Sequence, residues 1–548
     1  MTKNQKSGPG VIDRRSFVQK AALLAAGSAL PTSLLGCGNN IIIEIPCLGP
    51  AAPPVPVAGM TYIKASEIGC ALDCALDTGH NKITGGAATD DGPRINAAMA
   101  GATAANPITL IIDGSALISG LFLPAGGYWS IAGLGCGTGF FIKSGTNNDG
   151  IHNGAPNAAI PSDPGPPAPP RGMNVSLSNF TVSGNQGNGH NGDSTTGMYQ
   201  GTATTWYFSI NLMNLDNITV ENVVVVNSPA YHFRFSNVGN VTVSGCVMLS
   251  AGGNTDGLHF DGLANDITIS NCSFTMGDDA IALNCPEGYS GNISRVSVSN
   301  CTFNSESLMR LYTANGGAQF NIDTVSVSNC TGTMWEGAFV TGYRAPSKPN
   351  SITGLTISDC TLTAPAVLAI GENFGTIDIT NVTFIPHQSN VWWATPQQNH
   401  DSGFVRTSPA GPISPYVGSS LSINNCKTVA NGNMNVPAVI LEDTSTVNSL
   451  MLNGYAVQSG GSSSKAPELL HIILGSIGQL VLGSVESVNI AAPVSTGGFS
   501  SLGSVSGAGV LATGWEFPDA VMANGVPYIS ASTGLPSIKV GGQVQPYP

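Results

Sequence analysis

Five aspartates lie within one short stretch of a chain that has few charged residues. The stretch runs from Asn254 to Asn284, and its aspartates are Asp256, Asp261, Asp266, Asp278 and Asp279. Like charges held close together raise one pKa while another stays low. Such a set suits acid/base chemistry, in which one carboxylic acid donates a proton and a carboxylate activates water.

Two of these aspartates come directly before β-type segments that can be aligned, Asp256–Phe260 and Asp279–Leu283. Alternate side chains of a strand point to opposite faces. The inward pairs of this alignment are Leu258 with Ile281 and Phe260 with Leu283, and the outward pair is His259 with Ala282. Neighbouring strands lie about 4.8 Å apart, so we expect Asp256 and Asp279 to share one small surface.

The same alternation extends to the segments Tyr231–Phe235 and Ser307–Leu311. It predicts two outward columns, one of Tyr231, Asp256, Asp279 and Ser307, and one of Arg234, His259, Ala282 and Arg310. Acids beside bases in an open groove would suit hydrolysis of a glycosidic bond in a long polymer. The structural alternative is that the aspartates cap turns and that the outward Arg and His side chains are solvated.

The elements that would position these residues belong to an internal repeat. Its copies are Val175–Phe180, Ile218–Val223, Val241–Cys246, Ile267–Cys272, Val296–Cys301, Val325–Cys330, Leu355–Cys360, Ile377–Val382 and Leu421–Cys426. The central copies start at 218, 241, 267, 296, 325, 355 and 377, which are spacings of 23, 26, 29, 29, 30 and 22 residues. A repeat of this length with short strands and no helix is one coil of a β-helix. The predicted fold class is all-β: a single right-handed parallel β-helix with an N-terminal capping helix.

Two positions of the repeat predict columns along the stack. The fifth position is Asn at 179, 222, 271, 300, 329, 381 and 425, and the sixth is Cys at 246, 272, 301, 330, 360 and 426. Asn tolerates the left-handed backbone of a tight corner, and stacked amides can hydrogen-bond along the axis. We interpret the cysteines as small apolar side chains inside the stack, in preference to disulfides or a metal cluster. Cys70 and Cys74 are better disulfide candidates, with partners such as Cys47 or Cys136.

The N-terminus has the pattern of an export signal. Asp13–Lys20 resembles a twin-arginine motif, and the apolar run Ala21–Leu35 ends at Cys37, as in a bacterial lipoprotein cleavage site. The run is too short and too rich in Gly and Pro for a transmembrane helix. We therefore expect a chain exported by the twin-arginine route, periplasmic or on the cell surface, with a lipid anchor on Cys37 as its only membrane contact.

The expected organisation is a signal segment at 1–37, a Pro-rich tether at 38–60, a catalytic β-helix at 61–430 and a C-terminal β extension or cap at 431–548. Thr89–Met99 predicts a short helix begun by an aspartate, and Leu117–Leu123 predicts a strand. The formal net charge of −13 disfavours nucleic acid, which needs clustered Lys and Arg. We expect a monomer that takes a polysaccharide and needs no cofactor or metal.

Residues from about Asn211 to Asn329 resemble glycoside hydrolase family 28, the polygalacturonase family of the pectin-lyase-like β-helix superfamily. Asn227–His232 resembles its Asn-Ser-Pro-x-x-His segment, Asn254-Thr255-Asp256 its Asn-Thr-Asp motif, and Gly277-Asp278-Asp279 its Gly-Asp-Asp motif. The resemblance implies that Asp278 is the general acid. It also implies that Asp256 and Asp279 hold and deprotonate the attacking water, with inversion of configuration.

The chain departs from the family pattern after the aspartate pair. No Gly-His-Gly occurs, and Asn304–Tyr312 resembles the family's Arg-Ile-Lys coil, with Arg310 at the Arg and Tyr312 in place of the Lys. The resemblance assigns carboxylate binding to that Arg and Lys, so loss of the Lys weakens the case for galacturonate. The predicted substrate-binding residues are Arg310, His259, Arg234, Tyr231, His232 and Tyr312, with His232 or His259 as a replacement for the missing histidine.

Two other classes of function stay open. A polysaccharide lyase on the same fold would use a basic residue to remove a proton beside a uronate, often with Ca²⁺. A non-catalytic surface β-helix would bind glycans without shortening them.

Overall fold

The computed structural model describes residues 51–548 except 52–53, 55–56, 78–79, 81, 136, 147, 155–165, 187–206, 314–319, 342–350, 387–401, 408–415, 430–435, 442–443, 459–467, 473, 489–491 and 495–500. The signal segment, Cys37 and most of the predicted tether therefore lie outside the described residues. No helix in the described part of the chain has the length and apolar character needed to cross a membrane.

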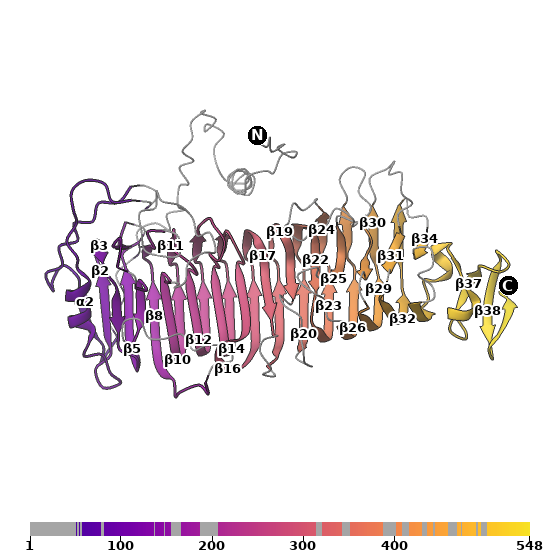
Figure 1. Cartoon of the computed structure of the whole chain (residues 1–548), viewed down its shortest axis with the longest axis horizontal. Helices are drawn as coiled ribbons and strands as arrows, with labels where there is room; N and C mark the ends of the chain where they lie inside the picture. Colours follow the sequence, from indigo (N-terminus) through magenta and orange to yellow (C-terminus); the bar gives the residue numbers. More distant parts are fainter. Residues whose placement is uncertain are drawn as a thin grey trace, which may run out of the picture.

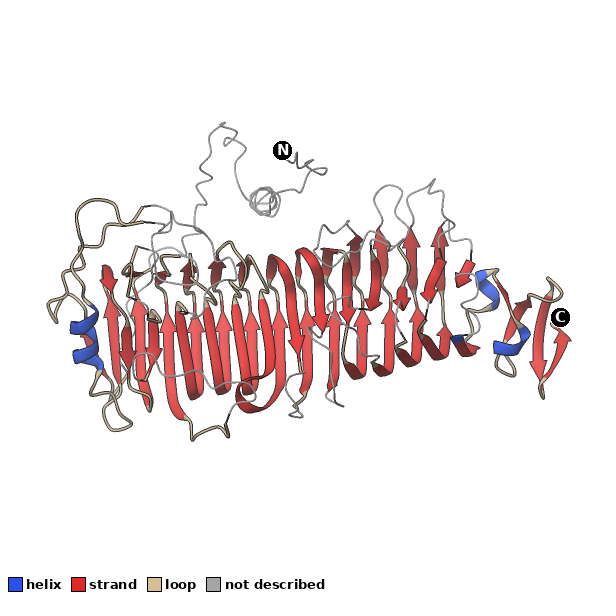
Figure 2. Ribbon diagram, viewed as in Figure 1, coloured by secondary structure: helices blue, strands red, loops and turns tan. Residues whose placement is uncertain are grey.

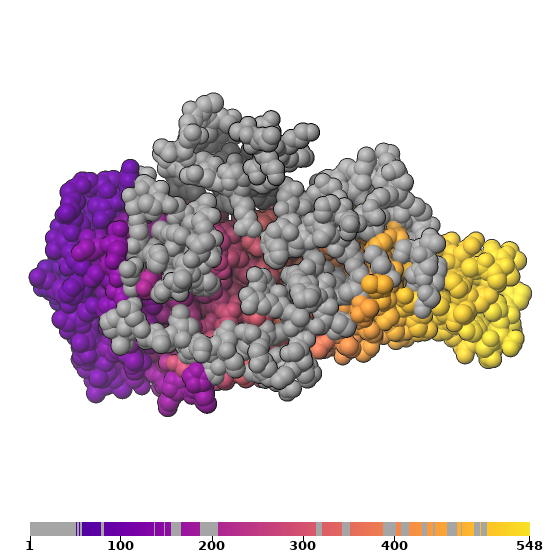
Figure 3. Space-filling view, in the orientation of Figure 1, coloured from indigo at the N-terminus to yellow at the C-terminus, as the bar shows by residue number. Residues whose placement is uncertain are grey.

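The chain forms an elongated stack of coils, with helix α2 (Gly92–Met99) at one end and a small separate sheet at the other (Figures 1 and 2). The strands of the stack pair in parallel with strands of the coils before and after. Figure 3 shows the molecule narrowing toward its C-terminal residues. The predicted parallel β-helix with an N-terminal helix is confirmed.

The coils form three parallel ladders, which we call the long ladder, the middle ladder and the site ladder. The long ladder contains β1 (Thr61–Lys64), β2 (Ile108–Ile112), β5 (Gly127–Gly133), β8 (Gly172–Ser178), β10 (Ile210–Glu221), β12 (Phe233–Ser244), β14 (Leu258–Ser270), β16 (Ile281–Ser299), β18 (Ile322–Ser328), β20 (Ser351–Ser358), β23 (Asn373–Thr380), β26 (Val417–Asn424), β29 (Thr446–Asn453), β32 (Ser476–Leu482) and β35 (Leu502–Ser506). The middle ladder contains β3 (Ser115–Ile118), β6 (Gly139–Ile142), β9 (Thr181–Ser183), β11 (Val224–Val226), β13 (Val247–Leu249), β15 (Ser273–Thr275), β17 (Thr302–Tyr312), β19 (Thr331–Thr341), β21 (Thr361–Ala364), β24 (Thr383–Pro386), β27 (Lys427–Val429), β30 (Tyr455–Gln458) and β33 (Val485–Val488).

The site ladder is formed partly by the ends of strands already named. It consists of β4 (Leu121–Leu123), β7 (Ile151–Asn153), the first residues of β10, β12, β14 and β16, the last residues of β17 and β19, and then β22 (Ala366–Ile370), β25 (Gly403–Thr407), β28 (Val439–Leu441), β31 (Glu468–Ile472) and β34 (Ala492–Val494).

The N-terminal helix is shorter than the predicted segment Thr89–Met99. It begins at Gly92, and Asp91 makes no side-chain cap to it. The Asp91 carboxylate instead accepts hydrogen bonds from the backbone N–H groups of Ala71 and Leu72, at 2.7 and 3.0 Å. The predicted strand Leu117–Leu123 is likewise divided into β3 and β4 by Gly120, whose φ of +138° ends the strand.

The six repeat cysteines form the predicted internal column. Cys246, Cys272, Cys301, Cys330, Cys360 and Cys426 are all buried in the main hydrophobic core, and all six thiols are free. Because each repeat lies directly on the previous one, these thiols pack between coils as small apolar groups. Cys70 and Cys74 also have free thiols, so the disulfide prediction for them is wrong, and Cys47 and Cys136 lie outside the described residues.

The repeat asparagines form the predicted corner. The seven asparagines of the fifth position, with Asp359 in one coil, all have φ between 51° and 58°. The amide of Asn222 donates to Asn179 at 3.2 Å, and that of Asn381 donates to Asp359 at 2.9 Å. The left-handed turn and the amide ladder therefore occur together, as expected for a side chain that tolerates this backbone.

The coils continue past residue 430, since β26 pairs with β29 and β29 with β32. The last coil strand, β35, is followed by a sheet of β36 (Glu516–Phe517), β37 (Pro527–Ser530), β38 (Pro536–Val540) and β39 (Gln543–Pro546). The division of the chain at residue 430 stays a prediction.

We expect the corner asparagines to contribute measurably to stability. Asn222→Ala should lower the free energy of unfolding by about 1–2 kcal/mol for the left-handed backbone, plus about 1 kcal/mol for the amide hydrogen bond. Asn222→Gly keeps the backbone freedom and should lose less. Urea unfolding of the three proteins tests this, and equal stability of the Ala and Gly variants would contradict the backbone argument.

Candidate active site

The strand register around the aspartates agrees with the one predicted. Leu258 pairs with Ile281, His259 with Ala282 and Phe260 with Leu283. Arg234 pairs with His259, and Ala282 with Arg310. The amide of Gly257 donates to the carbonyl of Asp279, and that of Ala280 to the carbonyl of Ser307, so the outward columns are stacked as expected.

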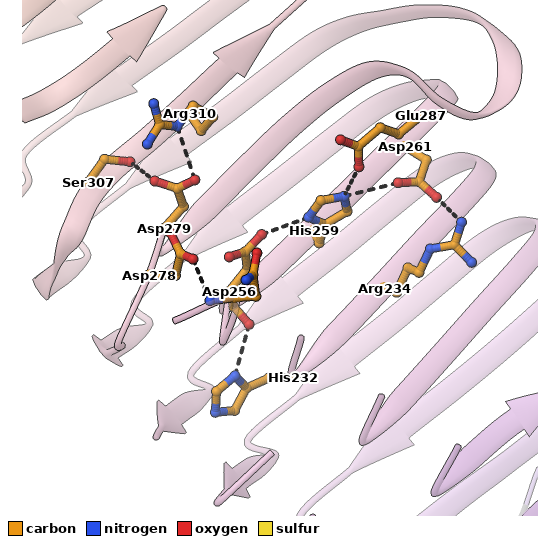
Figure 4. Close-up of polar contacts among 11 residues, drawn as sticks. His232, Arg234, Asp256, His259, Asp261, Asp278, Asp279, Glu287, Ser307 and Arg310 are labelled. Atoms are coloured by element: carbon orange, nitrogen blue, oxygen red, sulfur yellow. Dashed lines mark hydrogen bonds and ion pairs between the residues drawn. The ribbon is translucent and has the colours of Figure 1, made fainter. Parts of the chain in front are cut away.

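Three carboxyl groups converge at the N-terminal ends of β14 and β16. Asp256, Asp278 and Asp279 each present one oxygen, and these oxygens all lie within 4.8 Å of one another. Asp256 and Asp279 are buried, whereas Asp278 is half-buried and is the most exposed of the three. Figure 4 shows Asp278 beside Asp279, with Asp256 in the neighbouring coil.

Asp279 is held by two donors from the next coil. The Ser307 hydroxyl donates to Oδ1 at 2.6 Å, and Arg310 Nε donates to Oδ2 at 3.1 Å. The same guanidinium donates through Nη2 to Glu336 at 2.6 Å. These contacts fix the orientation of Asp279 and suit a carboxylate that accepts hydrogen bonds.

Asp278 is suited to carry a proton. Removal from water, followed by repulsion from Asp279 and Asp256, raises the pKa of its carboxyl well above the usual value. Its Oδ2 accepts a hydrogen bond from the backbone N–H of Asn254 at 2.5 Å, which opposes that rise only in part. A half-buried carboxylic acid whose pKa is raised in this way has the property of a general acid.

Asp256 is paired with His259 in its own coil. The His259 Nδ1 lies 2.7 Å from Asp256 Oδ2. Burial raises the pKa of Asp256 to about 6, against the opposing hydrogen bond and charge of His259 and with support from the charge of Asp279. Near neutral pH this carboxyl can therefore act as a base.

His259 contacts three acids and links them in one network of charged side chains. Its Nε2 lies 3.0 Å from Asp261 and 3.1 Å from Glu287, and Asp261 is in turn paired with the buried guanidinium of Arg234 (Figure 4). Burial alone would lower the pKa of His259, but its hydrogen bonds to these acids and to Asp256 raise it well above the usual value. The imidazole of His259 also stacks on Tyr231, with ring centroids 3.9 Å apart.

The structure contradicts the alternative in which the outward Arg and His side chains are solvated. Arg234, His259, Arg310 and Tyr312 are all buried on the outward side of the strands. The reason is that long side chains of adjacent coils cover one another and pair their charges at hydrogen-bond distance. Arg234 and His259 are therefore already paired within the protein. Arg234 pairs with Asp261, and His259 pairs with Asp256.

His232 and Tyr231 also have structural contacts. His232 is fully buried, its Nδ1 lies 2.8 Å from the carbonyl of Asp256, and its Nε2 lies 2.8 Å from the Ser250 hydroxyl. Burial lowers its pKa to about 4, so it is neutral. Both nitrogens have partners within the protein, and the predicted contact of His232 with substrate stays a prediction. Tyr231 is stacked between Phe208 and His259.

Sequence reasoning missed three acids, Glu287, Glu306 and Glu336. Glu306 lies beside Asp278 in the next coil, where its backbone N–H donates to the Asp278 carbonyl. The coil with Glu306 and Arg310 follows the aspartate coil directly, since β17 pairs with β16. Arg310 therefore lies beside Ala282, as the alternation predicted, and Val340 pairs with Arg310 in the coil beyond. The sequence signal for the place of this coil was the repeat spacing, since 296–301 and 325–330 are consecutive copies of the repeat.

Within the described part of the chain, two groups of side chains have the donor atoms for a cation. Asp256, Asp278 and Asp279 form an all-oxygen set of the kind that Ca²⁺ and Mg²⁺ prefer. The second set, His259, Asp261 and Glu287, is already joined by hydrogen bonds and an ion pair with Arg234.

Residues 171–331 match the model of the family described as Glycosyl hydrolases family 28. This match contains the three aspartates and Arg310, and it confirms the predicted resemblance for that part of the chain. A search of curated proteins gives no match.

Solved structures with the same kind of fold are distant. A family 28 exopolygalacturonase of Yersinia enterocolitica has 11% identity and a TM-score of 0.43, over 82% of this chain and 78% of that one. An exopolygalacturonase of Thermotoga maritima has 12% identity and a TM-score of 0.45, over 80% and 93%. A surface adhesin of Streptococcus pneumoniae has 11% identity and a TM-score of 0.44, over 76% and 92%. Likeness at this level carries no argument about activity.

We expect Arg234 to stabilise the folded protein, because its removal leaves the buried Asp261 carboxylate with one cation fewer beside it. Arg234→Met should lower the free energy of unfolding by roughly 3–5 kcal/mol. Arg295→Met is the matched control, since Arg295 pairs with Asp266 on the exposed surface and should change stability far less. Urea unfolding of both variants measures the difference, and equal effects would contradict a buried structural pair.

Loss of His259 should make Asp256 a weaker acid. In His259→Gln the pKa of Asp256 should rise above about 6, by about one unit or more, because a hydrogen-bonded positive charge is lost. The measurement is an NMR titration of ¹³C-carboxyl-labelled aspartate, with Asp256→Asn to assign the resonance. His471→Gln, which removes a histidine paired with Glu468 far along the stack, should leave the Asp256 titration unchanged.

Proposed function

We propose that the protein is a glycoside hydrolase that cleaves a polysaccharide at the carboxyl groups of Asp256, Asp278 and Asp279. The observation that carries this proposal is the convergence of three carboxyl oxygens within 4.8 Å, in surroundings that raise the pKa of Asp256 and Asp278. The match of residues 171–331 to a glycoside hydrolase family supports it.

The roles follow from the contacts of each carboxyl. Asp278 is the general acid that protonates the leaving oxygen, because its pKa is raised most strongly by burial and by the other two aspartates. Asp279, oriented by Ser307 and Arg310, and Asp256, oriented by His259, hold the water and take its proton.

The stereochemical outcome that we propose is inversion, as the family resemblance implies. The oxygens lie closer together than the roughly 6.5–9.5 Å common in inverting enzymes and nearer to the roughly 5–5.5 Å of retaining ones. Inversion here requires the water to be held by Asp256 and Asp279 together, with neither carboxylate attacking the sugar. The anomer of the first product, observed by NMR, distinguishes the two outcomes.

The aspartate roles are tested by isosteric substitution. Asp278→Asn should reduce the formation of new reducing ends by about 100- to 10,000-fold, because it removes the proton donor without changing the side-chain shape. Asp266→Asn is the matched control: Asp266 belongs to the same stretch but pairs with Arg295 on the exposed surface, and its loss should leave the rate unchanged. Equal rates for all three proteins would contradict the assignment.

The same assay separates the alternatives. A lyase acting on a uronate would give ultraviolet-absorbing ends and would depend on a cation, for which the three aspartates have the donor atoms. A glycan-binding β-helix would release no ends, and Asp278→Asn would bind glycans as the wild type does. Reducing ends without absorbance, lost in the variant, support the hydrolase.

The proposal also includes export of the protein, for which the only support is the sequence. The twin-arginine pattern and Cys37 predict a lipid-anchored protein outside the cytoplasm. Such a location would place the enzyme where polymers too large to enter the cell are found.

A further inference from the structure

The imidazole of His259 has one carboxylate at Nδ1 and two at Nε2. Nδ1 lies 2.7 Å from Asp256 Oδ2. Nε2 lies 3.0 Å from Asp261 Oδ1 and 3.1 Å from Glu287 Oε2 (Figure 4). A ring nitrogen carries at most one hydrogen, so Nε2 has a single hydrogen at most for two carboxylates. A metal ion at Nε2 can bind both carboxylates at once.

The three atoms at this end of the ring have separations that suit ligands of one small ion. Nitrogen and oxygen ligands lie about 2.0–2.2 Å from Zn²⁺, so two ligands at angles of about 90–110° are about 2.8–3.6 Å apart. The distances of 3.0 and 3.1 Å from His259 Nε2 fall in this range. The oxygens of Asp261 and Glu287 lie within 4.8 Å of each other. Because the Glu287 side chain is 29% exposed, a small rotation of it closes the set, and solvent reaches the site from its side.

A bulge in β16 brings Glu287 to this place. Asp261 of β14 pairs with Asn284, and the next residue, Gly262, pairs with Gly288. Residues 285–287 are therefore extra in β16, and Glu287 is the last of them. Bulges are frequent next to functional sites, where they redirect a side chain. This one directs the Glu287 carboxylate toward His259.

The backbone beside the bulge approaches Asp261 closely. Gly288 has a φ of +71°, and a Cβ there would lie 2.7 Å from Asp261 Oδ2 and 2.5 Å from Ser236 Oγ, so glycine is required. The Ser236 hydroxyl is fully buried and has no hydrogen-bond partner among the described residues. A buried hydroxyl without a partner is costly. It therefore indicates a polar ligand beside Asp261, such as a water molecule bound to an ion.

The remaining contacts of the set are compatible with a metal ion. Arg234 pairs with Oδ2 of Asp261, whereas the oxygen beside His259 is Oδ1. Asp256 accepts from the other ring nitrogen of His259, and such a carboxylate commonly fixes the tautomer and orientation of a metal-bound histidine. Two carboxylates match the charge of a divalent ion. One imidazole with two carboxylates is a donor set typical of Zn²⁺ or a similar transition metal rather than of Ca²⁺ or Mg²⁺.

We propose that His259 Nε2, Asp261 Oδ1 and Glu287 Oε2 bind a divalent transition-metal ion of the Zn²⁺ class. This inference departs from the expectation of a protein that needs no metal, and it does not rest on the proposed hydrolase function. The ion takes the place of the hydrogen at Nε2 and links β14 to the bulge of β16. It leaves the Nδ1–H of His259 directed at Asp256, so the ion positions Asp256 and takes no part in bond cleavage.

Zn²⁺ binding to the full chain tests the ligand set. After treatment with a chelator and dialysis, Zn²⁺ would be titrated by calorimetry into the wild type, Glu287→Gln and Glu486→Gln. Glu287→Gln should bind at least about 100-fold more weakly, since loss of a hydrogen-bond partner outside the ligands already costs about 10- to 100-fold. Glu486 lies on the exposed surface of β33, and its variant should bind as the wild type does. No Zn²⁺ binding by the wild type, or equal affinity in all three proteins, would overturn the inference.

The position of the ion separates this site from the other donor groups of the chain. Anomalous diffraction from crystals containing Zn²⁺ should give a peak between His259, Asp261 and Glu287. X-ray absorption should show nitrogen and oxygen ligands at about 2.0–2.1 Å and no sulfur at about 2.3 Å. Asp278→Asn should keep the wild-type affinity for Zn²⁺. A peak at the three aspartates of the proposed active site, or sulfur ligands from cysteines, would overturn the inference.

The positioning of Asp256 has a separate measurement. In the wild type, removal of the ion should shift the ¹³C-carboxyl resonance of Asp256, and Zn²⁺ should restore it. Glu287→Gln should not respond at the same Zn²⁺ concentration. An Asp256 resonance that stays unchanged in a wild type with Zn²⁺ bound would overturn the link between the ion and Asp256. Failure of the hydrolase function is recognised independently, by the absence of new reducing ends from any polymer with Zn²⁺ bound.

Discussion

The structure depends on one constraint, the stacking of successive coils in parallel register. At a spacing of about 4.8 Å, a residue type that recurs at one position of the repeat must touch its own copies. The constraint is harmless for Cys, Val and Ile inside the stack and useful for Asn at the corner, where amides hydrogen-bond along the axis. For charged residues the same stacking is unfavourable, because it brings like charges together.

The proposed active site depends on this close approach of like charges. Asp256 and Asp279 are neighbours in consecutive coils, and Asp278 beside them completes a group whose mutual repulsion and burial raise the pKa values of Asp256 and Asp278. Arg310 and His259 keep the cluster together, each shared between acids of different coils. The balance is local, because these two cations hold the carboxylates in place.

The fold alone does not decide the activity. As a general rule, function belongs to the site and not to the fold. The family match over residues 171–331 covers the coils where the acids converge. Those coils keep the aspartates in place.

The sequence by itself determined the coil architecture, the inward cysteines, the asparagine corner and the register that pairs Asp256 with Asp279. These features follow from alternation and repeat spacing, which are local properties of the chain. The tertiary structure decided that Arg234, His259 and His232 are buried and paired, because strand alternation does not specify which side chains cover them or which atoms they contact. It also decided that Glu306 lies beside Asp278 and that Arg310 is shared with Glu336, since these contacts depend on side-chain reach between coils, which alternation does not specify.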